Sequence, residues 1–192
     1  LLRAFGEERP HVEVSVRELL LDRLDALLAG GVDVAFTRLL PGQADVELEI
    51  LSREPRVVAL PASHQLSTRT EVRFEDLRRE SFITNPALET SEPPMRWLAE
   101  QARHGLPGRV AARAASVQEI LTLVAGGKGV CLVPLSVARH FPRADLAYVQ
   151  VRDADPAVVS LAWPRGSVRP IVQAFIEMAR AQVSGGLPVP AP

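Results

Sequence analysis

The residue types that most often carry chemistry are few in this sequence and widely spaced. Its single cysteine, Cys131, lies in an apolar run, and its four histidines (His11, His64, His104 and His140) are far from one another. Metal sites need several ligands at short spacings, and a nucleophilic cysteine needs a base close to it. The sequence therefore predicts no metal site and a buried, inert Cys131.

The run Gly126-Gly127-Lys128-Gly129 contains the Gly-Lys pair of a phosphate-binding loop. A P-loop also needs a glycine five positions before that pair and a Ser or Thr after it, where this chain has Gly129. Glycines that end a helix explain the run better. The sequence contains no G-x-S-x-G, H-E-x-x-H or G-x-G-x-x-G pattern. We therefore expect neither an enzyme activity nor a cofactor.

Composition narrows the class of protein further. The chain has 192 residues, of which 47% are hydrophobic and 23% charged, as in ordinary globular proteins. Its 22 basic and 23 acidic residues create no positive field, so we expect this chain alone not to bind nucleic acid. Because no apolar run is long enough to span a bilayer and the N-terminus is unlike a secretion signal, we expect a cytoplasmic protein with no membrane contact.

Hydrophobic periodicity predicts a strand, a helix and a second strand near the N-terminus. Valines alternate with polar residues over Val12–Val16, as in a strand, and the leucines of Leu20–Leu28 repeat at helical spacing. Gly30 and Gly31 then end the helix, and the apolar run Val32–Thr37 suits a strand of a parallel sheet that is covered on both faces. We expect a right-handed crossover here.

The same patterns continue along the chain. Ser116 and Glu119 have the spacing of a capping box, which predicts a helix from Ser116 to Gly126. Further strands are predicted at 46–51, 56–61, 81–84, 109–113, 130–134, 146–151 and 158–163, and further helices at 1–8, 74–78, 92–104 and 168–183. Strands that alternate with helices predict an α/β fold.

Several strings, in this order and spacing, resemble the effector-binding domain of LysR-type transcriptional regulators. They are Arg9 to Val12, Leu27 to Phe36, Glu54 to His64, Ser116 to Gly126 and Gly129 to Pro134. The resemblance covers Leu1 to about Val183. Within it, the run Ala35 to Pro41 is most similar to members that control the breakdown of aromatic compounds and chlorocatechols.

The resemblance implies two α/β lobes with mixed sheets, joined by two crossing strands, as in type 2 periplasmic binding proteins. Lobe I is expected at 1–55 and 159–192, without its first strand, and lobe II at 56–158. The crossings place the hinge at Pro55, Arg56, Val158 and Val159. A small effector is expected in the cleft between the lobes.

The predicted effector-binding residues lie at strand ends and helix starts. In open α/β sheets ligands bind beyond the carboxyl ends of strands, where helix N-termini present unpaired N–H groups. The predicted set is Arg17, Glu18, Thr37 and Arg38 from lobe I and Thr84, Asn85, Pro86, Ser116, Val117, Gln118 and Pro134 from lobe II.

The family also implies partners for this chain. We expect a small carboxylate or aromatic-pathway effector, a homodimer or homotetramer formed through the lobes, and contact with DNA only through a winged helix that precedes this domain and lies outside this chain. Two alternative functions stay open, beside a purely structural module that would leave the two-lobe pattern unexplained. A solute-binding protein of a transport system shares the lobes, and an enzyme on this scaffold would need a positioned acid, base or nucleophile.

Overall fold

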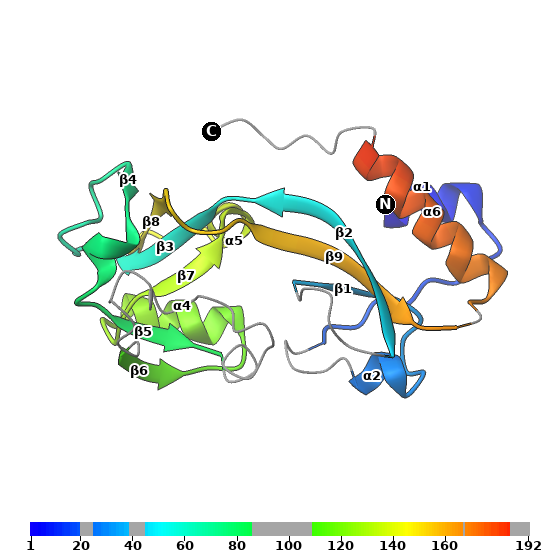
Figure 1. Cartoon of the computed structure of the whole chain (residues 1–192), viewed down its shortest axis with the longest axis horizontal. Helices are drawn as coiled ribbons and strands as arrows, with labels where there is room; N and C mark the ends of the chain where they lie inside the picture. Colours follow the sequence, from blue (N-terminus) through cyan, green and yellow to red (C-terminus); the bar gives the residue numbers. More distant parts are fainter. Residues whose placement is uncertain (20–24, 39–44, 86–108, 167, 185–192) are drawn as a thin grey trace. The chain divides into compact units, whose positions relative to one another are not determined.

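The computed structural model describes residues 1–19, 25–38, 45–85, 109–166 and 168–184 (Figure 1). The described residues up to Arg53 and those from Val158 onwards form one compact unit, and those from Glu54 to Ala157 form a second. The chain thus passes from one unit to the other along β2 and returns along β9. The predicted hinge residues Pro55, Arg56, Val158 and Val159 lie next to these limits, and the predicted lobe boundaries stay a prediction.

The elements of the two units follow in chain order. The first unit holds α1 (Leu2–Glu8), α2 (Asp25–Leu28), β1 (Ala35–Thr37), β2 (Val46–Glu54), β9 (Ala157–Pro164) and α6 (Pro170–Ser184). The second holds β3 (Arg56–Pro61), β4 (Glu71–Val72), the 3-10 helix η1 (Phe74–Leu77), β5 (Ser81–Thr84), β6 (Arg109–Arg113), α4 (Val117–Ala125), β7 (Cys131–Pro134), α5 (Leu135–His140) and β8 (Leu146–Val151). The last residue of β2 and the first of β9 belong to the second unit.

In the first unit, β9 lies between β1 and β2 (Figure 1). β1 runs antiparallel to β9, with Ala35 opposite Ala162. Helices α1 and α6 pack on this sheet through apolar side chains, among which the rings of Phe5 and Phe175 meet edge to face at 5.1 Å. Burial of these side chains stabilises the unit, because apolar area removed from water contributes roughly 25 cal/mol per Å².

In the second unit, β3 lies inside the strand order β4-β8-β3-β7 and is antiparallel to both β7 and β8. Val57 to Leu60 are all buried. Because successive side chains of a strand point to opposite faces, Val57 and Ala59 pack towards α4, while Val58 and Leu60 pack with η1 and β5. A core on both faces explains why this strand is a continuous apolar run.

The structure confirms the predicted α/β class and most of the predicted strands. The strands at 56–61, 81–84, 109–113 and 146–151 have the predicted bounds, and β2, β7 and β9 differ from prediction by a few residues at their ends. α2 covers the end of the predicted Leu20–Leu28 helix. The rest of that helix from Leu20, the helix at 92–104 and Pro86 lie outside the described residues.

Three predictions near the N-terminus are wrong. Residues 12–19 form no strand, and Val14 and Val16 are 41% and 75% exposed, so the alternating valines gain too little burial to favour one. The predicted crossover into β1 therefore does not exist. β1 also lies in an antiparallel pair rather than a parallel sheet, and its Phe36 is 52% exposed, so this strand is not covered on both faces.

A close backbone approach explains one of the glycines of the Gly126–Gly129 run. Beside it, the Val130 N–H donates to the Ser81 carbonyl at 2.8 Å, and the Ile83 N–H donates to the Val130 carbonyl at 2.8 Å. A Cβ at Gly129 would lie 2.5 Å from the Ser81 carbonyl oxygen. The glycine thus lets the segment before β7 lie against β5.

Gly129→Ala is expected to lower the free energy of unfolding by about 2–3 kcal/mol, because the added methyl group meets backbone that cannot move without breaking these bonds. Gly6→Ala is the control, because a Cβ there meets nothing within 4 Å. In a helix that change is expected to raise stability by about 0.5–1 kcal/mol. Urea unfolding measures both changes, and equal stabilities for the two variants would contradict the close approach.

Candidate functional site

The end of β5 is bound to the residues that precede α4. Thr84 and Asn85 are polar but only 5% and 3% exposed. The Thr84 carbonyl accepts from the Ala114 N–H, and the Asn85 Nδ2 donates to the Ala115 carbonyl, both at 3.0 Å. The two strand-exit residues predicted from the sequence therefore hold the start of α4 at the carboxyl end of β5.

Half of the predicted capping box forms at the start of α4: the serine bond is made, but the glutamate bonds to the N–H of Ala115 instead of that of Ser116. The Ser116 Oγ accepts from the Glu119 N–H at 3.2 Å, and the Glu119 Oε2 accepts at 3.1 Å from the N–H of Ala115, one residue before the cap. The N–H groups of Val117 and Gln118, also in the first turn, have no acceptor within the helix. N–H groups of this kind and the helix dipole favour a negative charge near a helix start, and the Glu119 carboxylate already lies in this turn.

The other end of α4 confirms the helix-ending prediction for its glycines. The Gly127 N–H donates to the Val124 carbonyl at 2.9 Å, and the Lys128 N–H donates to the Leu123 carbonyl at 3.0 Å. Gly127 has a φ of 69°, in the left-handed region that glycine adopts without strain. These two bonds form a Schellman motif, so the Gly-Lys pair closes a helix rather than cradling a phosphate.

Pro134, a predicted effector residue, lies beside two predicted hinge residues. It is the last residue of β7, where it pairs with Arg56, and it precedes α5, whose Leu135 N–H donates to the Pro55 carbonyl at 2.9 Å. Arg56 Nε in turn donates to the Asp155 carbonyl at 2.9 Å, just before β9.

A contact that sequence reasoning missed, between Glu54 and Ser136, lies next to Pro55 and Pro134 in the chain. The Glu54 carboxylate accepts from the Ser136 N–H at 2.7 Å and from its Oγ at 3.0 Å. It thus caps α5, a helix that was not predicted because six residues are too few for a periodic pattern. The two residues are 82 positions apart, so no local spacing signals the contact.

The predicted residues of the first unit lie at or near the end of β1 and in the segment 12–19. Thr37 ends β1 opposite the buried Ser160, and Arg38 follows it directly. Arg17 and Glu18 are exposed, and because residues 12–19 form no strand, Arg17 does not follow a strand end as predicted. Val158 and Val159 lie in β9, with Val158 buried. Whether these residues contact an effector stays a prediction.

The environment of Cys131 makes its thiol a poor nucleophile. Cys131 is buried, and the cost of desolvating a thiolate raises its pKa to about 12 in spite of the opposing effect of Arg56. Within the described ranges, no group of three His, Cys, Asp or Glu side chains is placed to hold a metal ion. No helix of that part of the chain is both long and apolar enough to cross a membrane.

Comparison with models of protein families shows which family this chain belongs to. The model of the LysR substrate binding domain matches residues 1–184. The chain belongs to this family. Over 173 residues this LysR domain is 32% identical to the HTH-type transcriptional regulator CatR of Pseudomonas putida, covering 89% of this chain and 59% of CatR. It is 27% identical over 158 residues to the HTH-type transcriptional regulator BenM of Acinetobacter baylyi, covering 81% of this chain and 52% of BenM.

Solved structures agree on the fold of this LysR domain. The effector-binding domain of BenM with its effector benzoate is 25% identical, with a TM-score of 0.74 over 94% of this chain and 82% of that one. Full-length CbnR complexed with its target DNA is 24% identical, with a TM-score of 0.76 over 95% of this chain and 64% of that one. The periplasmic-binding-protein-like fold class predicted from the sequence is confirmed.

Both named relatives are HTH-type transcriptional regulators. The chain spans 59% of the length of CatR and 52% of the length of BenM.

The burial of Cys131 predicts how its thiol reacts. At pH 8 the thiol is expected to stay protonated, and modification by Ellman's reagent is expected only through unfolding, because the thiolate is the reactive form and its pKa is about 12. The rate should rise to that of a free thiol in denaturing urea. Rapid modification of the native protein would contradict the burial of Cys131 and would favour a reactive cysteine.

Proposed function

We propose that this chain is the effector-sensing part of a LysR-type transcriptional regulator, and that it binds a small carboxylate or aromatic-pathway metabolite without transforming it. Membership of the family, the regulators among its relatives and the likeness to the BenM domain with benzoate support this function. In the proposed regulator, DNA contact belongs to a winged-helix part outside this chain, the chain assembles as a homodimer or homotetramer, and the protein acts in the cytoplasm.

The observation that carries the proposal is the first turn of α4. Its start is fixed to the end of β5 by the buried Asn85, and its amides at Val117 and Gln118 are of the kind that bind carboxylates. A helix N-terminus stabilises an anion by about 0.3–1 kcal/mol at the surface and by up to about 2 when partly buried. A hydrogen bond to a charged group adds about 1.5–3 kcal/mol.

Contacts of this free energy suit a protein that senses metabolites. Several of them, less the cost of ordering the ligand, give an affinity near the micromolar range, or about 8 kcal/mol. Thr84, Asn85, Ser116 and Pro134 are proposed to shape the site in the second unit. Arg17, Glu18, Thr37 and Arg38 of the first unit are proposed as further contacts.

Neither alternative function has comparable support. A solute-binding protein for transport would share the fold, but the relatives named above are transcriptional regulators. Catalysis would need a positioned nucleophile, acid or base, and the thiol of Cys131 is buried with its pKa raised to about 12. We therefore propose that the site binds its ligand and leaves it unchanged.

Val117→Pro tests the proposed amide contact directly. Proline fits the first position of a helix, and Ser116 before it already has the extended backbone that precedes a proline, with φ −120° and ψ 155°. The change therefore removes one N–H and replaces a side chain that is partly buried against the core. Benzoate, used as the probe, is expected to bind about tenfold more weakly in calorimetry, because a hydrogen bond to its carboxylate is lost.

The matched control is Val117→Ala, which shortens the same side chain but keeps the N–H. It is expected to leave the benzoate dissociation constant within about twofold of the parent, and thermal unfolding verifies that both variants fold. Equal losses in the two variants would contradict the amide contact. Failure of the parent to bind benzoate, muconate or any other aromatic or dicarboxylic acid would contradict the proposed function.

A further inference from the structure

The loop between α5 and β8, residues 141–145, is bound to the elements around it. The Phe141 N–H donates to the Val137 carbonyl at 2.9 Å, and the Tyr148 hydroxyl donates to the Phe141 carbonyl at 2.8 Å. At the other end of the loop, the Asp145 carbonyl accepts from the Ala62 N–H at 3.0 Å. The loop is therefore a fixed support rather than a loose connection.

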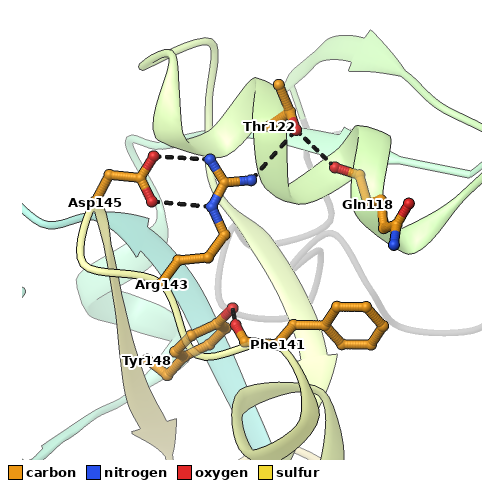
Figure 2. Close-up of polar contacts among 6 residues, drawn as sticks. All are labelled: Gln118, Thr122, Phe141, Arg143, Asp145 and Tyr148. Atoms are coloured by element: carbon orange, nitrogen blue, oxygen red, sulfur yellow. Dashed lines mark hydrogen bonds and ion pairs between the residues drawn. The ribbon is translucent and has the colours of Figure 1, made fainter.

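Arg143 of this loop is oriented by a two-point contact with Asp145 (Figure 2). Its Nε donates to Oδ1 at 2.9 Å and its Nη2 donates to Oδ2 at 2.7 Å. This side-chain hydrogen bonding raises the pKa of Arg143 and lowers that of Asp145. A planar guanidinium held at two points has a defined direction, which an ammonium group would lack.

The remaining arm of the guanidinium reaches α4. Arg143 Nη1 donates to the Thr122 Oγ1 at 3.3 Å, and the same hydroxyl donates to the Gln118 carbonyl at 2.9 Å (Figure 2). The Thr122 hydroxyl thus accepts on one side and donates on the other. The contact begins in the 141–145 loop and ends on the backbone of the first turn of α4, at one of the predicted effector residues.

The apolar face of α4 does not by itself fix the rotation of the helix about its axis. Ile120, Leu121 and Val124 bury this nine-residue helix against the sheet. Apolar packing is not directional, so it limits a small turn of the helix about its axis less strictly than a hydrogen bond does. A first turn that binds a carboxylate needs its N–H groups aimed to within about 10–20°.

We propose that Arg143, oriented by Asp145, is a positioning residue for effector binding, and that it acts through Thr122 to fix the direction of the first turn of α4. This inference rests on the proposed function of that turn. The competing account is a surface ion pair without a role, because exposed pairs contribute only about 0–1 kcal/mol to stability. The side chains of Arg143 and Asp145 are 34% and 54% exposed, so stability alone does not distinguish the two accounts.

The first experiment measures the helix without any ligand. The Glu119 N–H is bonded to the Ser116 Oγ and the Ile120 N–H to the Ser116 carbonyl, at 3.2 and 3.0 Å, so their exchange with solvent reports on the first turn. Thr122→Val removes the hydroxyl at nearly constant shape and is expected to speed exchange of both amides about threefold or more, as loss of a hydrogen bond does. Thr122→Ser keeps the hydroxyl and is expected to exchange like the parent.

Arg143→Ala is expected to have the same effect as Thr122→Val, and the double variant no more than either, because the two changes remove one shared contact. Arg152→Ala is the matched control, since it removes an exposed arginine of the same unit that pairs with Glu71 at 3.3 Å. In this control variant the Glu119 and Ile120 amides are expected to exchange at the rates found in the parent. Exchange in Arg143→Ala that equals exchange in Arg152→Ala would overturn the proposal.

The second experiment measures benzoate binding by calorimetry in the same proteins. Arg143→Ala and Thr122→Val are expected to weaken binding about threefold or more, as misdirected hydrogen bonds do, while Thr122→Ser and Arg152→Ala stay within about twofold. Faster exchange with unchanged benzoate affinity would overturn the positioning role. If the parent binds no aromatic or dicarboxylic acid, the proposed function fails, and the exchange measurement still decides whether Arg143 orients the helix.

Discussion

The buried amide of Asn85 joins the end of β5 to the start of α4, and the binding account depends on that bond. A buried polar group left without a partner costs about 1–3 kcal/mol, so α4 cannot shift from the Ala115 contact without a penalty of that order. The helix start is therefore held at one place on the sheet edge. Its first-turn amides are donors that need no proton transfer to act, which suits a group that recognises a carboxylate and releases it unchanged.

Much of the fold follows from patterns that are complete within a few residues. The apolar run at 56–61 predicts a strand, because Val57 to Leu60 have no polar residue to place in water, and the structure adds that these residues are buried on both faces of the sheet. Ser116 and Glu119 predicted the start of α4, and Gly126 and Gly127 predicted its end, because capping bonds join residues close in sequence.

Features that depend on distant residues could not be predicted in the same way. Alternating valines at 12–16 suggested a strand, but a strand also needs a neighbour and a buried face, and neither is visible in the spacing. The predicted residues Thr84, Asn85 and Ser116 do lie near one another, because the end of β5 is bonded to Ala114 and Ala115, just before α4. Glu54 with Ser136 and Arg143 with Thr122 were missed, because these pairs are 82 and 21 positions apart and each residue alone is an ordinary surface type.

The most direct test of the central claim is a titration of the isotope-labelled chain with benzoate, followed through its amide resonances by NMR. The largest shifts are expected at Val117 and Gln118, and they should saturate together and give the dissociation constant found by calorimetry. Saturable binding with its largest shifts far from α4, for instance in α6 or the β3–β4 connection, would contradict the claim that the first turn of α4 holds the ligand.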